Sequence, residues 1–163
     1  MPLPNHRPRG FTLIELVMVM AVIAILALMA LPSLQGKYIR EQIVEAMPLA
    51  DIAKRPIELA WPVMKSMPDD NAALGLPAAD KIVNNVVKSV TVEAGAIHIV
   101  FGNRANGALQ GKTLTLRPAV VEDAPVVPVA WVCGHAIGPD KMKVLGTDRT
   151  DIPKAYLPIR CMG

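Results

Sequence analysis

The segment RGFTLIELVMVMAVIAILALMALPSL, Arg9 to Leu34, is the most distinctive part of this chain of 163 residues. No polar residue occurs from Leu16 to Pro32, and the whole segment carries a single carboxylate, Glu15. About 20 helical residues, each rising ~1.5 Å, cross the ~30 Å hydrocarbon core of a bilayer. The segment therefore predicts a transmembrane helix. A carboxylate in such a helix costs roughly 2.5–3.5 kcal/mol and indicates a functional site.

Two simpler interpretations account for less of this segment. A secretory signal peptide has an apolar core of about 7–15 residues followed by a cleavage site of small residues. The apolar run here is longer, and Leu31-Pro32 offers no such site. A plain membrane anchor remains the alternative, but it explains neither Glu15 nor the Gly10-Phe11 pair directly after Arg9.

The residues RGFTLIEL resemble the start of the type IV pilin and pseudopilin superfamily. In that family a prepilin peptidase cuts a short basic leader after its final Gly, the next Phe is N-methylated, and a Glu stands at the fifth mature position. The resemblance assigns cleavage to Gly10 and Phe11, methylation to Phe11, and axial register during assembly to Glu15. It implies that residues 1–10 are a leader and that Glu15 accepts the N-terminal amine of a neighbouring subunit.

Charge and cysteine content indicate where the rest of the chain resides. His6, Arg7 and Arg9 precede the span without any acidic residue, which predicts a cytoplasmic N-terminus and an exported remainder. In an oxidising compartment the two cysteines, Cys133 and Cys161, are expected to form one disulfide. A metal site is the alternative, because His135 follows Cys133 closely, but no C-x-x-C spacing supports it.

The helical pattern continues beyond the span as a one-sided apolar stripe with steps of three and four residues. Its members are Ile39, Ile43, Ala46, Ala50, Ala53, Ile57, Ala60 and Met64. Opposite charges at i,i+4 accompany it in the pairs Lys37/Glu41, Asp51/Arg55 and Lys54/Glu58. One helix of ~80 Å is predicted from about Phe11 to the mid-sixties. Pilins commonly carry a kinking proline where Pro32 stands, and Pro48, Pro56 and Pro62 predict further kinks or a break near Pro62.

The second half of the chain predicts an antiparallel sheet. A loop at 67–80, with a short helical turn after Pro77, precedes four strand patterns at 86–93, 96–101, 112–118 and 126–133. The first two are joined by Ala94-Gly95, a candidate tight turn. The fold class is thus α+β: a long N-terminal helix packed on a four-stranded antiparallel sheet, as in the pilin fold. The expected divisions are a leader at 1–10, a transmembrane half-helix at 11–34 and a globular domain at 35–163.

The tail from Gly134 to Gly163 is polar and has few apolar residues. Closing it through Cys133 and Cys161 would stabilise the chain by roughly 3.5 kcal/mol in the loop-entropy estimate, less any strain. The sequences WVCG and IPKAYLPIRC resemble the disulfide-bounded C-terminal region of type IVa pilins.

No catalytic constellation is evident around His98, His135 or the serines, and no cofactor is expected. The carboxylates Asp140, Asp148 and Asp151 match no EF-hand spacing, which leaves calcium a minor alternative. The resemblance implies a structural subunit of a type IV pilus, stored in the inner membrane and polymerised for adhesion, twitching motility or DNA uptake. It also implies a prepilin peptidase, an assembly platform and an ATPase as partners.

Two other functions remain open. One is a pseudopilin of a type II secretion system, because the N-terminal motif fits it equally. The other is a minor pilin for DNA uptake that would bind nucleic acid through basic tail residues. These are Lys141, Lys143, Arg149, Lys154 and Arg160, offset by three aspartates. Such a mixture is typical of a solvated face, and the formal charge of +3 drops to +1 when Arg7 and Arg9 leave with the leader.

Overall fold

The computed structural model describes residues 10–163, except for the side chains of residues 30–33. The expected leader, apart from Gly10, lies outside the described residues, and so does the side chain of Pro32, where a kink is expected. Contacts divide the chain into residues 1–35 and residues 36–163, which are treated separately below. Helix α1, Leu13–Met64, begins in the first unit and ends in the second. Its assignment continues through Pro48, Pro56 and Pro62, so the expected end in the mid-sixties is correct and no break occurs at Pro62.

The second half of α1 buries one stripe of side chains in the core of residues 36–163. The buried members are Ile39, Ile43, Ala46, Ala50, Ala53, Ile57 and Trp61. The predicted stripe is therefore correct as far as Ile57 and wrong beyond it, because Met64 is 56% exposed and Trp61 takes the last buried position. A step of four residues from Ile57 places the Trp61 ring, rather than Ala60, against the core.

The charges flanking the stripe pair differently from the prediction. Lys54 binds Asp51 at 2.8 Å, three residues away, rather than Glu58. Glu58 instead accepts the indole N–H of Trp131 at 2.8 Å. A tertiary hydrogen bond to the sheet thus replaces a local ion pair.

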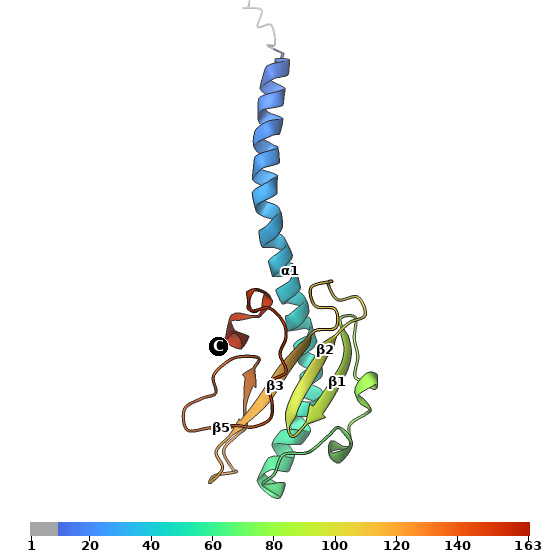
Figure 1. The fold of residues 1–163 in the computed structure, drawn as a ribbon, viewed down its shortest axis with the longest axis vertical. Coiled ribbons are helices and arrows are strands. Elements are labelled where there is room, and N and C mark those ends of the chain that lie inside the picture. The colour runs from blue at the N-terminus through green and yellow to red at the C-terminus, as the bar shows by residue number, and fades with distance from the viewer. Residues whose placement is uncertain (1–9) are drawn as a thin grey trace, which may run out of the picture. The chain divides into compact units, whose positions relative to one another are not determined.

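The sheet has five strands, all paired antiparallel: β1 Val87–Glu93, β2 Ala96–Phe101, β3 Thr113–Val120, β4 Ala130–Cys133 and β5 Lys143–Val144 (Figure 1). The strand order is β1-β2-β3-β4, and β5 pairs with β3. The antiparallel sheet is confirmed, but the prediction of four strands is wrong by one. Pairing of β2 with β3 ends at Leu116, which leaves one edge of β3 open beyond that residue, and β5 fills it through Ala119 and Val120.

The β1–β2 connection is the tight turn that the sequence predicts. Ala94 and Gly95 have φ values of 47° and 79°, and two positive values in a two-residue loop define a type I′ hairpin turn. The turn is bound to the loop that follows α1, since the N–H groups of Ala94 and Gly95 donate to the carbonyls of Asp69 and Pro68. That loop carries two short 3₁₀ helices, η1 Ala72–Leu74 and η2 Ala79–Lys81, the second of which matches the expected turn after Pro77.

Strand β4 starts four residues later than the sequence pattern predicts. Residues 121–127 form two successive turns instead, in which the N–H of Ala124 bonds the carbonyl of Val121 and the N–H of Val127 bonds that of Ala124. Pro125 and Pro128 have no N–H for a ladder, so this stretch cannot pair regularly with β3.

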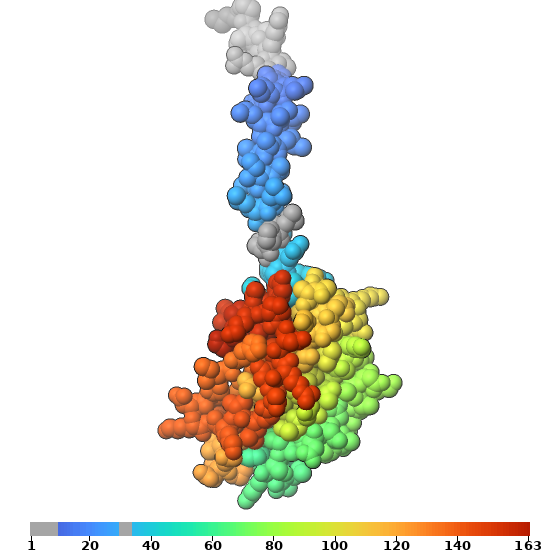
Figure 2. All heavy atoms as spheres, in the orientation of Figure 1, coloured from blue at the N-terminus to red at the C-terminus, as the bar shows by residue number. Residues whose placement is uncertain are grey.

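Strands β2 and β3 are buried nearly throughout. One face packs on the stripe of α1, and their polar members His98 and Thr115 lie beneath the C-terminal segment. That segment contains η3 Lys154–Tyr156 and η4 Ile159–Cys161 and forms the red band on the face shown in Figure 2. The core of residues 36–163 is thus enclosed between a helix and an irregular polar segment.

Candidate assembly site and disulfide-closed segment

Helix α1 begins with a cap made by Thr12 and Glu15. The Thr12 hydroxyl accepts the backbone N–H of Glu15 at 3.3 Å and donates to Oε2 of Glu15 at 3.5 Å. Thr at the N-cap and Glu three residues later is the capping-box spacing. The hydroxyl satisfies one of the four N–H groups that every helix start leaves without an internal partner. Glu15 therefore contributes to the helix start, a role separate from the assembly role that the sequence predicts for it.

The residues expected to be processed are accessible in this structure. Gly10, Phe11, Thr12 and Glu15 line a hollow of 460 Å³. The Phe11 side chain is 81% exposed, and no atom lies within 4 Å of the position that a Cβ on Gly10 would occupy. Among residues 10–163, no cation lies within ion-pair distance of Glu15. This carboxylate is open to a charge from outside its own chain.

Every described side chain from residue 11 to residue 29 is exposed. The helix contains an 18-residue window of mean hydropathy 2.8, which is long and apolar enough to cross a membrane. An apolar surface of this extent is not stable in water, so it requires lipid or packed protein around it.

At the other end of the chain, Cys133 of β4 and Cys161 of η4 form a disulfide, as the sequence predicts. Gly134 follows Cys133 with φ of +53°, and a Cβ there would stand 2.8 Å from the carbonyl oxygen of Cys161. The N–H of His135 donates to the same carbonyl at 3.1 Å. The two ends of the closed segment are thus joined by a covalent bond and a hydrogen bond, with no room for a side chain at residue 134.

A polar cluster holds the middle of the closed segment. Nδ1 of His135 lies 2.9 Å from Oδ2 of Asp148, and Oδ1 of Asp148 accepts the N–H of Thr150 at 2.9 Å. Burial by itself raises the pKa of Asp148, but hydrogen bonds from Thr150 and His135 and the nearby Arg117 charge outweigh it, so the pKa is lowered. The Arg117 guanidinium donates to the carbonyl of Gly134 at 3.0 Å, which ties the segment to β3.

A second polar pair lies beneath this segment. His98 is 4% exposed, and its Nδ1 lies 3.0 Å from the hydroxyl of Thr115. That hydroxyl accepts the N–H of Arg149, so its own proton is available to a neutral imidazole. Burial, followed by the Arg149 charge, lowers the pKa of His98. The interior of the fold therefore favours an uncharged His98.

These polar residues are engaged in holding the fold. The candidate calcium ligands Asp148 and Asp151 are hydrogen-bonded to separate partners, the latter to the N–H of Thr113 at 2.6 Å. Within residues 10–163, no three His, Cys, Asp or Glu side chains gather closely enough to hold a metal ion. Cys133, the alternative metal ligand beside His135, is oxidised.

The pilin family of bacterial filament proteins matches residues 40–162, and the prokaryotic N-terminal methylation motif matches residues 5–31. The chain belongs to the pilin family. Pilins are structural proteins rather than enzymes, and they assemble with copies of themselves into filaments.

Relatives extend the similarity over almost the whole pilin. A fimbrial protein of Neisseria meningitidis serogroup B is 33% identical, over 96% of this chain and 95% of the relative. The type IV major pilin protein PilE of Neisseria gonorrhoeae is 35% identical, over 82% of this chain and 78% of the relative. Fimbrial protein EcpC of Eikenella corrodens is 42% identical, over 77% of this chain and 81% of the relative.

The structure brings together most of the residues that the sequence of this pilin singles out. Gly10, Phe11 and Glu15 line one hollow, and Cys133 and Cys161 are bonded. Sequence reasoning missed Thr12, although the spacing Thr-x-x-Glu was a readable signal for it. It also missed the pairing of His135 with Asp148, which no local sequence pattern predicts.

Some basic residues of the tail form ion pairs. Lys143 pairs with Glu122 at 2.8 Å, and Arg149 pairs with Glu93. Two of the five cations considered for nucleic acid thus have carboxylate partners on other segments.

Proposed function

We propose that this chain is a structural subunit of a type IV pilus. The peptide bond after Gly10 is cut, Phe11 is methylated, and residues 11–34 hold the subunit in the inner membrane with its N-terminus in the cytoplasm. Residues 35–163 form the exported domain, and the mature subunit polymerises into an extracellular helical filament. The main support for the proposal is an exposed apolar helix in a member of the pilin family. An accessible Gly10-Phe11 bond and Glu15 lie at the start of that helix.

Polymerisation needs a signal for axial register, because a surface of Leu, Val, Ile and Ala slides easily along another of the same kind. In this proposal the Glu15 carboxylate of one subunit accepts the N-terminal amine of Phe11 of its neighbour. In a dry filament core the two charges compensate each other. If one subunit is shifted along the axis relative to its neighbour, both charges are buried without a partner. A buried charge without its partner costs several kcal/mol, so wrong registers are penalised.

Further partners follow from the same proposal. A prepilin peptidase removes the leader, and an inner-membrane platform with an ATPase drives assembly. The filament serves adhesion, twitching motility or DNA uptake, and a deletion strain assayed for each process separates these roles. The names of the relatives, which are fimbrial proteins and a type IV major pilin, favour a pilus over a secretion pseudopilus.

The experiment combines the mass of the mature subunit with filament yield. Filaments sheared from cells should contain a chain that starts with N-methylated Phe11. In cells whose only pilin carries Glu15→Leu, leader cleavage and membrane insertion should persist while filament yield falls. An intact Met1 on assembled protein, or normal yield with Glu15→Leu, would favour a plain membrane anchor.

A further inference from the structure

We propose that the β3–β4 loop of one copy, residues 121–129, docks into a groove on a second copy in the filament. The groove, called here the docking groove, lies between residues 37–44 of α1 and residues 158–162 near the C-terminus. The inference rests on the proposed function, because it names a contact between the globular domains of neighbouring subunits.

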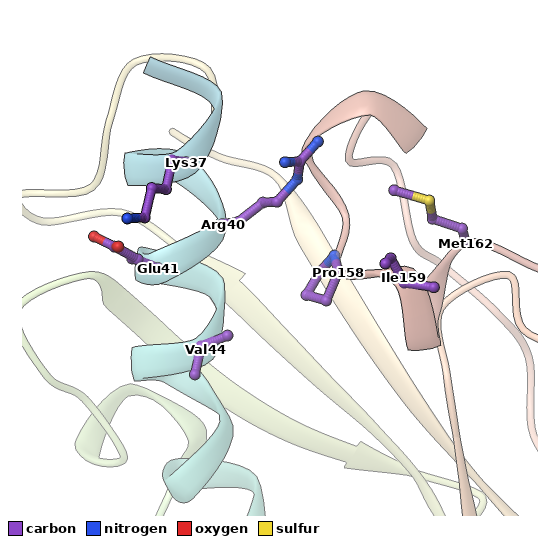
Figure 3. A pocket seen from close by; sticks show the side chains of 7 residues that line it. All are labelled: Lys37, Arg40, Glu41, Val44, Pro158, Ile159 and Met162. Atoms are coloured by element: carbon purple, nitrogen blue, oxygen red, sulfur yellow. The ribbon is translucent and has the colours of Figure 1, made fainter. Parts of the chain in front are cut away.

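The docking groove has a volume of 560 Å³ and walls from two distant parts of the sequence. Figure 3 shows Arg40 reaching from α1 toward the chain that leads into η4, with Pro158, Ile159 and Met162 on the opposite side. Ile159 is 89% exposed and Val44 is 51% exposed. These side chains cost free energy in water and gain it when an apolar group covers them.

Cations border the apolar part of the docking groove. Among residues 10–163, neither Lys37 nor Arg40 has a carboxylate within ion-pair distance. The Arg40 guanidinium is held at the groove by a hydrogen bond of 2.8 Å to the carbonyl of Ala155. Glu41 also lines the groove and lies beside Lys37 in Figure 3, so the lining carries two cations and one carboxylate. The excess charge is positive, and the groove therefore suits a partner that combines a small apolar group with a negative charge.

The β3–β4 loop has this composition. Its sequence VEDAPVVPV, residues 121–129, places Val126, which is 86% exposed, three residues after Asp123. Glu122 is bound to Lys143, whereas Asp123 is exposed and has no ion pair within the described part of the chain. Two turns and two prolines restrain the loop, so little conformational entropy is lost when Val126 is inserted into a partner.

The loop lies near the C-terminal end of α1, and the red segment that contributes to the docking groove lies beside the start of the second half of that helix (Figure 1). The loop packs beside Glu58, Trp61 and Pro62, where it borders a cavity of 260 Å³. The groove begins at Lys37, and the helical rise from Arg40 to Trp61 is ~32 Å. Two different surfaces at opposite ends are what a head-to-tail contact requires, and repeating such a contact without closure generates a filament.

Cross-linking within filaments tests the contact. A chain carrying Val44→Cys and Val126→Cys is supplied as the only pilin, and sheared filaments are treated with a short bifunctional maleimide, which leaves the native disulfide untouched. The two positions are too far apart to be bridged within one chain. We therefore expect a ladder of covalent multimers on a denaturing gel.

Each control has a defined outcome. The single variants and the pair Val44→Cys with Ile137→Cys should give no ladder, because Ile137 is 89% exposed but lies outside both the loop and the docking groove. Filaments that form without any Val44–Val126 ladder overturn the docking inference and leave the proposed function intact. Absence of filaments from the wild-type chain overturns the proposed function instead. The reaction of Val44→Cys with maleimide gives a further outcome. If the cysteine reacts in filaments and is protected only in membrane-held subunits, the groove faces lipid and the inference is wrong.

Charge reversal provides a second test that needs no cysteine. Lys37→Glu and Asp123→Lys should each lower filament yield several-fold, and the double variant should recover most of it, because the opposite charges again face each other. Equal yields from the wild type and both single variants, or failure of the double variant to recover, would contradict docking of this loop in this groove.

Discussion

At the scale of single residues, Glu15 takes part in the helix cap and has, in our proposal, a separable role in assembly. Its backbone N–H and carboxylate take part in the cap with Thr12, and its charge is available to a neighbouring subunit. A capping box accepts Gln as well as Glu, because either side chain supplies an oxygen acceptor. Substitution by Gln therefore removes the charge and keeps both bonds to Thr12, whereas substitution by Leu keeps only the bond from the backbone N–H.

We predict that Glu15→Gln lowers filament yield as strongly as Glu15→Leu, with normal leader cleavage. The matched control is Thr12→Ala, which weakens the helix start by about 1 kcal/mol but keeps the charge. It should reduce yield much less. The ratio of sheared filament to membrane-held subunit measures all three variants. Normal yield from Glu15→Gln together with loss from Thr12→Ala would assign the defect to the cap rather than to the charge.

Gly134 is the residue at which backbone conformation and close packing coincide. Gly134→Ala should destabilise residues 36–163 by at least about 1–2 kcal/mol, because φ of +53° is strained for alanine. A further cost comes from the contact with the Cys161 carbonyl. Gly107→Ala is the control, since a Cβ there meets nothing within 4 Å and no positive φ is involved. Thermal unfolding of the detergent-solubilised chain, followed by fluorescence of Trp61 and Trp131, should show a lower Tm for Gly134→Ala alone.

At the scale of elements, the C-terminal segment is a cover with little secondary structure of its own. It contributes β5 and two short 3₁₀ helices, and it is held by the disulfide, by Arg117 and by the His135–Asp148 pair. Its removal from the sheet would expose His98 and Thr115, which are buried beneath it. Because such a segment gains little from repetitive backbone pairing, its order depends on these few tertiary contacts.

Cys161→Ser should therefore destabilise residues 36–163 by about 3.5 kcal/mol, less any strain released, since the disulfide closes a segment of sequence separation 28. Limited proteolysis should then cut between residues 134 and 158, which should resist cleavage in the wild type. Reduced wild-type protein is the matched control and should behave like the variant. An unchanged Tm and digestion pattern would show that the remaining contacts hold the segment without the covalent bond.

At the scale of the whole molecule, pH links two polar groups, buried His98 and half-buried Asp148, to global stability. Burial lowers the pKa of His98 in the folded state, so at pH values below about 6.5 the unfolded chain binds a proton that the folded chain does not. The folded state then loses stability as pH falls. The lowered pKa of Asp148 acts in a separate range. Its stabilising contribution is present above the pKa of an aspartate in an unfolded chain, about 3.9, and is lost as pH falls below that value.

We predict that the free energy of unfolding decreases as pH is lowered from 7 to 5, and that His98→Gln reduces this decrease. Gln keeps a hydrogen-bonding side chain near Thr115 but cannot take up a proton in this range. The measurement is denaturant unfolding at several pH values, with the difference between wild type and variant attributed to His98. Parallel stability–pH curves for the two proteins would show that His98 is not the group responsible.

Local patterns in the sequence were sufficient to predict the features that depend on neighbours along the chain. The 3.6-residue period of Ile39, Ile43 and Ile57 predicts the buried side of α1, and Ala94-Gly95 predicts the hairpin turn. The even number of cysteines, in a chain that the sequence predicts to be exported, predicts the Cys133–Cys161 bond. The N-terminal motif indicates the family before any contact is known, because it is read from consecutive residues.

Contacts between distant segments were decided only by tertiary packing. The pairing of Val144 with Ala119 creates β5 from two residues that carry no strand pattern of their own. Trp61 displaces Ala60 from the predicted stripe, and His98 is buried because residues 148–150 fold across it. Each of these outcomes depends on the burial of a side chain by residues far along the chain. The free energy gained by that burial depends on contacts that form only when the chain folds. A short window of sequence therefore cannot predict it.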